Sequence, residues 1–119
     1  MLNLNSLMIG TSQFEKMAGF YEEILGKKPN MKESEWVGWQ IGASFLGIGT
    51  HSEMKGKAKD PGRVMFNLET KDVKGEFERI KKLGTKVVKS PYDMGGAWIA
   101  TFAYPDGNYF QLMTPWEAK

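Results

Sequence analysis

The stretch Tyr104-Pro105-Asp106-Gly107-Asn108-Tyr109-Phe110-Gln111-Leu112-Met113 decides the fold. Pro105 sets φ at the first corner of a turn and Gly107 tolerates a positive φ, so the first half predicts a tight hairpin connection. Residues 109–113 then alternate as a strand does, with Phe110 and Leu112 on one side and Tyr109, Gln111 and Met113 on the other. We therefore expect one side to pack on helices and the other to line a cavity that has Gln111 in its floor.

Composition restricts the class of protein. The chain has 119 residues, enough for one domain with its own core, and it contains no cysteine, which excludes disulfides and thiolate chemistry. The 16 basic and 14 acidic residues are scattered along the chain and give a net charge of only +2. We therefore expect neither nucleic acid nor a membrane surface as a partner. No run of about 18 apolar residues and no basic leader occurs, and we expect a soluble, cytoplasmic protein.

The same order of elements is predicted twice. In the first half, a strand at 2–10 precedes a helix from Phe14 to Leu25 that Gly26 ends, and strands follow at 27–31, 35–41 and 43–50. In the second half, a strand at 63–69 precedes a helix that Gly84 ends, and strands follow at 85–89, 97–103 and 108–114. We predict that Ser12 caps the first helix, with Glu15 completing a capping box, and that Asp72 caps the second.

The repeat predicts the architecture. We expect an α+β fold in which two βαβββ modules, residues 1–50 and 63–115, form a concave mixed sheet with the helices on its convex face. The polar segment 51–62, closed by Pro61-Gly62, is the linker, and 1–119 form a single domain. Two such modules side by side can enclose a cleft, and the sequence leaves open whether both come from one chain or from the two chains of a dimer.

Three motifs carry a family resemblance. The segments 20–26 (FYEEILG), 63–73 (RVMFNLETKDV) and 105–112 (PDGNYFQL) resemble the helix end, the second-module opening and the closing hairpin of the vicinal oxygen chelate superfamily. This superfamily includes glyoxalase I, bleomycin-resistance proteins and extradiol dioxygenases. The resemblance implies paired βαβββ modules, usually in a homodimer, that hold a ligand in a concave sheet. In the enzymes, His or Glu residues of the strands bind a divalent metal.

The resemblance also indicates where such a metal would be bound. Carried over residue by residue, the ligand positions fall on Ser6, on Leu46 or Gly47, on Arg63 or Val64, and on Gln111. A catalytic metal site normally uses about three or more anionic or imidazole donors, and a cation at Arg63 would repel the metal. We therefore expect no metal and no cofactor. The single histidine, His51, lies at the start of the linker, where we expect a solvated side chain.

Without a metal, the cavity is expected to be largely apolar. If Gln111 faces the cavity, alternation puts Tyr109 and Met113 on the same side of their strand. The residues expected to face the cavity from the opening strands of the two modules are Ser6 and Met8, and Arg63, Met65 and Asn67. The residues expected to pack on helices are Val64, Phe66 and Leu68. Which of Trp36, Trp39 and Trp98 faces inward is open, as is whether Tyr104 lies at the cleft or only modifies the turn. The predicted ligand-binding set is Ser6, Met8, Trp39, Arg63, Met65, Asn67, Trp98, Tyr109, Gln111 and Met113.

Simpler structural roles exist for several of these residues. The methionines Met8, Met65 and Met113 are consistent with ordinary core positions, and Gln111 with a residue that satisfies backbone groups. Arg63 is consistent with a rim residue paired with a carboxylate.

Three functions are compatible with this sequence. The first is a protein that binds a small, largely apolar or aromatic molecule without a catalytic metal. The alternative is a metal-dependent lyase, isomerase or dioxygenase related to glyoxalase I, with a non-standard ligand set. The third is an interaction module whose dimer matters more than its cavity. In each case we expect a homodimer, because exposed sheet edges favour pairing.

Overall fold

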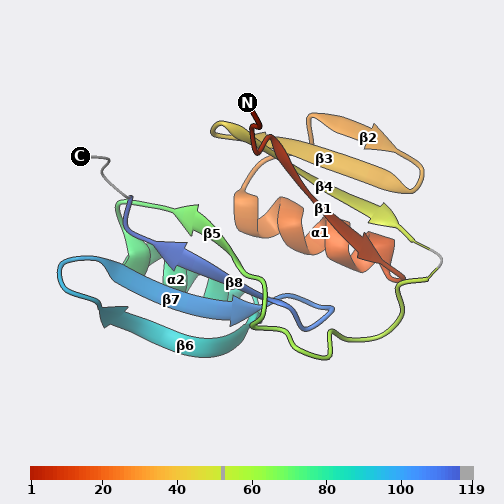
Figure 1. Cartoon of the computed structure of the whole chain (residues 1–119). Coiled ribbons are helices and arrows are strands. Elements are labelled where there is room, and N and C mark those ends of the chain that lie inside the picture. Colours follow the sequence, from red (N-terminus) through yellow and green to blue (C-terminus); the bar gives the residue numbers. More distant parts are fainter. Residues whose placement is uncertain (52, 116–119) are drawn as a thin grey trace. The chain divides into compact units, whose positions relative to one another are not determined.

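The computed structural model describes residues 1–51 and 53–115 and divides into two compact units, Met1–Gly56 and the chain from Lys57 onward. Each unit contains one helix and one four-stranded mixed sheet in the order βαβββ (Figure 1). The predicted α+β class and the two βαβββ modules are confirmed. No helix in the described part of the chain is long and apolar enough to cross a membrane.

The first unit is built around a helix and a sheet that bury aromatic residues between them. Its elements are β1 (Ser6–Thr11), α1 (Phe14–Leu25), β2 (Met31–Glu33), β3 (Trp36–Ile41) and β4 (Ser44–Thr50). The sheet order is β1-β4-β3-β2, with β1 parallel to β4 and the other neighbours antiparallel. Tyr21 of α1 and Trp39 of β3 are fully buried, with ring centroids 6.5 Å apart, so α1 covers the Trp39 side of this sheet.

The second unit repeats this arrangement. Its elements are β5 (Phe66–Glu69), α2 (Val73–Lys82), β6 (Lys86–Asp93), β7 (Trp98–Ala103) and β8 (Tyr109–Met113), in the sheet order β5-β8-β7-β6. Aromatic rings connect helix and sheet: Phe77 of α2 stacks on Phe102 at 5.1 Å, and Phe102 stacks on Phe110 at 5.7 Å. Phe110 and Leu112 are buried, as the alternation predicts.

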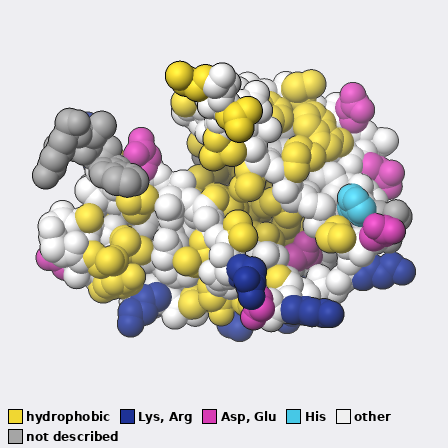
Figure 2. Space-filling model, in the orientation of Figure 1, with side chains coloured by type: hydrophobic (Ala, Val, Ile, Leu, Met, Phe, Trp, Pro, Cys, Tyr) yellow, Lys and Arg dark blue, Asp and Glu magenta, His cyan; other side chains and the backbone are white. Residues whose placement is uncertain are grey.

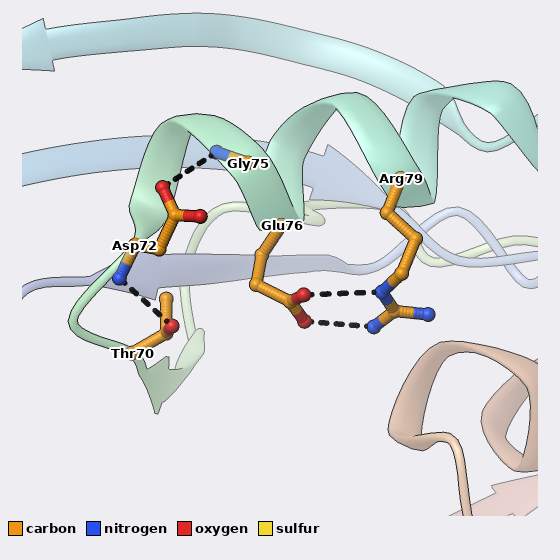
Figure 3. A network of polar contacts seen from close by, with 5 residues as sticks. All are labelled: Thr70, Asp72, Gly75, Glu76 and Arg79. Atoms are coloured by element: carbon orange, nitrogen blue, oxygen red, sulfur yellow. Dashed lines mark hydrogen bonds and ion pairs between the residues drawn. The ribbon is translucent and has the colours of Figure 1, made fainter.

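The two helices begin differently. At α2, the Asp72 carboxylate accepts a hydrogen bond from the Gly75 amide (2.9 Å), and Glu76 and Arg79 form an ion pair at 2.8 Å one turn along (Figure 3). The predicted Asp72 cap is therefore confirmed. At α1 the N-cap is Gln13, whose side chain makes no capping hydrogen bond, so the predicted Ser12 capping box is wrong. The Thr11 hydroxyl accepts from the Gln13 amide instead (3.0 Å), and the helix begins at Phe14 as predicted.

Three strands begin at least three residues later than predicted, and the first of them, β1, starts at Ser6 and not at residue 2. Residues 27–30 are tied to β3 by isolated bonds, such as the one from Trp39 Nε1 to the Lys27 carbonyl (3.0 Å), and Pro29 has no amide for a ladder. Ladder pairing thus starts only at Met31. Likewise β5 starts at Phe66, because the Arg63 amide donates to the Asp60 carbonyl (3.1 Å) and prolongs the turn at Pro61-Gly62. Val64 is 69% exposed, so its predicted packing on helices is wrong.

The closing hairpin has the predicted turn. The Gly107 amide donates to the Tyr104 carbonyl (2.7 Å), and Gly107 has a φ of 92°, a value that favours glycine. The Ala58 amide donates to the carbonyl of Asp106 (3.0 Å), so the segment that opens the second unit is attached to this hairpin. The hairpin therefore fixes both the direction of β8 and the chain before β5.

Candidate functional site

Each sheet has a second face that its own helix does not cover, which we call the open face. Figure 1 shows α1 and α2 each lying along one face of a sheet. Because Phe110 and Leu112 lie in the α2 core, alternation places Gln111 on the open face of the second sheet. In the first sheet, Ile9 is buried on the helix side, which places Ser6 and Met8 on the open face.

The open face of the first sheet is a floor of glycines covered by aromatic rings. One cross-strand row runs Met8, Gly47, Gly38, Met31, and the glycines are buried although the two methionines are 57% and 53% exposed. A Cβ added to Gly38 would overlap the ring of Phe45, and one added to Gly49 would lie 2.9 Å from the Trp36 ring. The rings thus occupy the space that side chains would fill, and hydrophobic side chains are exposed over this unit (Figure 2).

The open face of the second sheet is more polar. Register places Asn67 of β5, Gln111 of β8 and Thr101 of β7 in one row. The Gln111 side-chain amide donates to the Thr101 hydroxyl (3.1 Å), and Thr101 is only 5% exposed. Tyr109 and Met113 are half-buried beside Gln111 on the same face. This row can therefore offer the Asn67 amide and the Gln111 carbonyl oxygen to a polar group.

The two predicted tryptophans lie on the helix sides of their sheets. Trp39 is fully buried against Tyr21, and the Lys74 ammonium of α2 lies 3.9 Å from the centroid of the Trp98 ring. Alternation along β3 places Trp36 on the other side of the strand from Trp39, so Trp36 lies on the open face of the first sheet. The open faces therefore include Ser6, Met8, Asn67, Tyr109, Gln111 and Met113 from the predicted set, but neither Trp39 nor Trp98.

Arg63 and Met65 lie before β5, in the chain that leads to it. The Arg63 guanidinium approaches the Asp60 carboxylate at 3.6 Å in an exposed pair, which matches the simpler role expected for Arg63. Met65 is 40% exposed. A depression of about 410 Å³ brings Arg63 together with Tyr109 and is also lined by Asp60, Pro61 and Gly62. Arg63 thus lies near the end of β8, not within the row that contains Gln111.

Tyr104 occupies a buried position at the base of the hairpin. It is 6% exposed, and burial, followed by the nearby charge of Asp106, raises the pKa of its phenol well above the ordinary value of 10.0. Its neighbour Asp106 is also buried, at 7% exposure. The phenol is therefore neutral at physiological pH, and Tyr104 belongs to the packing of the turn.

The donor set at the family's metal positions does not fit a catalytic metal. Ser6 and Gln111 offer a neutral hydroxyl and a neutral amide oxygen, and the Gln111 amide nitrogen is already bonded to Thr101. In residues 1–51 and 53–115, no three His, Asp or Glu side chains come together in a group that could hold a metal ion. His51 is exposed, and its Nδ1 accepts a hydrogen bond from the Glu53 amide (3.2 Å).

The sequence reasoning missed several open-face residues. Thr101 was missed because its position beside Gln111 depends on the pairing of β7 with β8, which one strand's alternation does not reveal. Phe45 was missed for the same reason, since it lies opposite Ser6 and Gln40 only in the folded register. Glu69 could have been found, because it is two residues after Asn67 on the same strand.

Comparisons with known proteins agree with this geometry. The family profile described as "Glyoxalase/Bleomycin resistance protein/Dioxygenase superfamily" matches residues 3–112. A glyoxalase-related enzyme from Fulvimarina pelagi is 18% identical over 97% of this chain and 89% of its own, with a TM-score of 0.80. A hypothetical protein from S. aureus is 26% identical over 96% of this chain and 93% of its own, with a TM-score of 0.72.

A lactoylglutathione lyase from Agrobacterium tumefaciens is 17% identical over 94% of this chain and 92% of its own, with a TM-score of 0.74. A search of curated protein sequences finds no match. The structural likenesses concern the fold.

Proposed function

The chain belongs to the glyoxalase/bleomycin resistance protein/dioxygenase superfamily, and from that premise we propose that it binds a small, largely apolar or aromatic molecule without a catalytic metal. The molecule binds on the open face of a sheet. Sequestration or sensing of such a molecule requires only binding, so no reaction step is needed.

The observation that carries this proposal is the aromatic floor of the first sheet. Trp36 and Phe45 stack with ring centroids 5.9 Å apart and rings inclined by 18°, and both are only half-buried. Aromatic rings that remain accessible supply a large contact area at a small cost in side-chain entropy. Met8 beside them adds a polarisable thioether that adapts to the shape of a ligand.

The open face of the second sheet offers polar contacts of its own. The Gln111 side chain is held by Thr101, which fixes its orientation before a ligand arrives. A preorganised amide loses less entropy on binding than a free one, so its carbonyl oxygen can orient a ligand donor at low cost. Replacing Gln111 with leucine would remove that acceptor while keeping a similar volume.

The test uses the full chain purified under native conditions. Denaturing mass spectrometry identifies any small molecule that copurifies, and elemental analysis after dialysis against Zn²⁺, Ni²⁺, Mn²⁺ or Fe²⁺ measures bound metal. We expect an organic molecule that is lost in Trp36→Leu, and metal well below one equivalent. One tightly held equivalent of metal would overturn the proposal, as would chelator-sensitive turnover of a 2-oxoaldehyde thiol adduct or a catechol, which would indicate a metal-dependent lyase or dioxygenase.

A further inference from the structure

The open face of the first sheet has an uneven distribution of charge. Among the residues of β1 to β4, all of which the structure describes, the face carries one charged side chain, the exposed Glu33 of β2. Glu33 lies directly opposite Trp36 in the register of β2 and β3. Lys32 pairs with Val37 and so points to the other side. Glu33 therefore shares this face with Trp36, and no lysine or arginine of β1 to β4 lies on it.

Two aromatic rings lie close to the glycines of this face. The Trp36 ring lies over Gly47 and Gly49, with ring atoms 3.4 and 2.9 Å from the positions their Cβ atoms would take, and the Phe45 ring overlies Gly38. Glycines in strand interiors are unfavourable, and here they allow the two rings to lie close against the backbone. The result is a pair of stacked, half-buried rings, with an exposed methionine, Met8 or Met31, at each end of the central row of the face.

Resting on the proposed function, we infer that the occupant of this face is a planar aromatic cation, such as a protonated heteroaromatic ring. A flat ring stacks on the accessible rings of Trp36 and Phe45, and the negative face of an indole attracts a positive charge. The negative charge of Glu33 on the adjacent strand also attracts a cation, and the thioethers of Met8 and Met31 contact the edges of the ligand ring. An aromatic anion of the same shape is repelled by both the indole face and the carboxylate.

Three probes separate shape from charge. These are 9-aminoacridine, a planar cation; acridine-9-carboxylate, a planar anion with the same rings; and 1-adamantylamine, a compact cation without a flat ring. Binding to the full chain is measured by equilibrium dialysis at low salt. We expect 9-aminoacridine to bind at one site per chain, at least about tenfold more tightly than either other probe.

Variants assign the site. Trp36→Leu is expected to weaken 9-aminoacridine binding about tenfold, whereas Trp98→Leu, on the helix side of the other sheet, leaves it unchanged. Glu33→Gln is expected to weaken binding about threefold without affecting folding, because Glu33 is exposed, and Glu15→Gln on α1 is its matched control.

Failure of this inference differs from failure of the proposed function. If acridine-9-carboxylate binds as tightly as 9-aminoacridine, or Glu33→Gln changes nothing, the cation preference is overturned while small-molecule binding stands. If Trp36→Leu has no effect, or this face proves to be buried against a second copy of the chain, the assignment to this face is overturned. If no organic probe binds and none copurifies, both proposals fall together.

Discussion

Gly38 lies at the centre of the first sheet, where an added Cβ would overlap the Phe45 ring and lie 3.0 Å from Trp36. We predict that Gly38→Ala lowers the free energy of unfolding by about 1–3 kcal/mol, because the rings must leave their positions. Gly19 of α1 has no atom within 4 Å of its Cβ position, and Gly19→Ala should instead stabilise by about 0.5–1 kcal/mol. Urea unfolding followed by far-UV circular dichroism measures both, and equal effects would contradict the account of the floor.

Tyr104 makes stability depend on alkaline pH. Its phenol has a raised pKa in the folded chain, so the unfolded chain loses the proton first. Its contribution to stability is complete below pH 10 and is lost as the pH rises above the unfolded pKa of about 10. We predict that Tyr104→Phe makes the decline in unfolding free energy shallower by up to about 1.4 kcal/mol per pH unit above pH 10.

Urea titrations at several pH values between about 9.5 and 11 measure this slope. A Tyr104→Phe protein that loses stability with pH as steeply as the wild type would show that the phenol is not responsible.

The helices α1 and α2 differ in how their first turns are satisfied. The Asp72 carboxylate bonds the Gly75 amide and lies at the positive end of the helix dipole, so we predict that Asp72→Ala costs about 1 kcal/mol of unfolding free energy. Ser12 is not the N-cap of α1, and Ser12→Ala should change stability by less than about 0.5 kcal/mol. Thermal unfolding of the two variants compares the costs, and similar losses would restore the Ser12 capping box.

Sequence patterns predict those features that depend on one element at a time. Alternation along β8 separates buried Phe110 from half-buried Gln111, because only one side of that strand meets α2. The same rule places Trp36 and Trp39 on opposite faces but cannot say which face the helix covers, since both rings are apolar. The start of β5 was missed because the turn at Asp60 to Arg63 is closed by a backbone bond that residue type does not specify.

The two units share one topology but differ in the chemistry of their open faces. The first pairs glycines on β3 and β4 and covers them with rings, whereas the second has Thr101 and Gln111 on the equivalent strands β7 and β8, with Asn67 beside them on β5. Two copies of one βαβββ unit therefore supply two kinds of contact, one for flat apolar surface and one for hydrogen bonding. Divergence within the repeat thus gives one chain two open faces with different chemistry.

The edges of the sheets lead us to propose a homodimer. The edge strand β6 carries Lys86, Lys89 and Pro91 and has register shifts, all of which discourage pairing with another chain. The edge strand β1 has no charged residue and no proline, so nothing of this kind opposes its pairing with a strand of another chain. We predict that the chain sediments as a dimer at micromolar concentration.

Matched lysine substitutions test the role of the β1 edge. Leu7 of β1 and Val88 of β6 are similarly exposed, at 36% and 37%, so Leu7→Lys and Val88→Lys introduce the same charge at comparable positions of the two edges. Since a lysine on an edge strand opposes pairing, Leu7→Lys should raise the dissociation constant at least about tenfold. Val88→Lys should leave the dimer intact, because β6 already carries such residues. Sedimentation velocity distinguishes these results, and a monomeric wild type or equal effects of the two variants would refute pairing through β1.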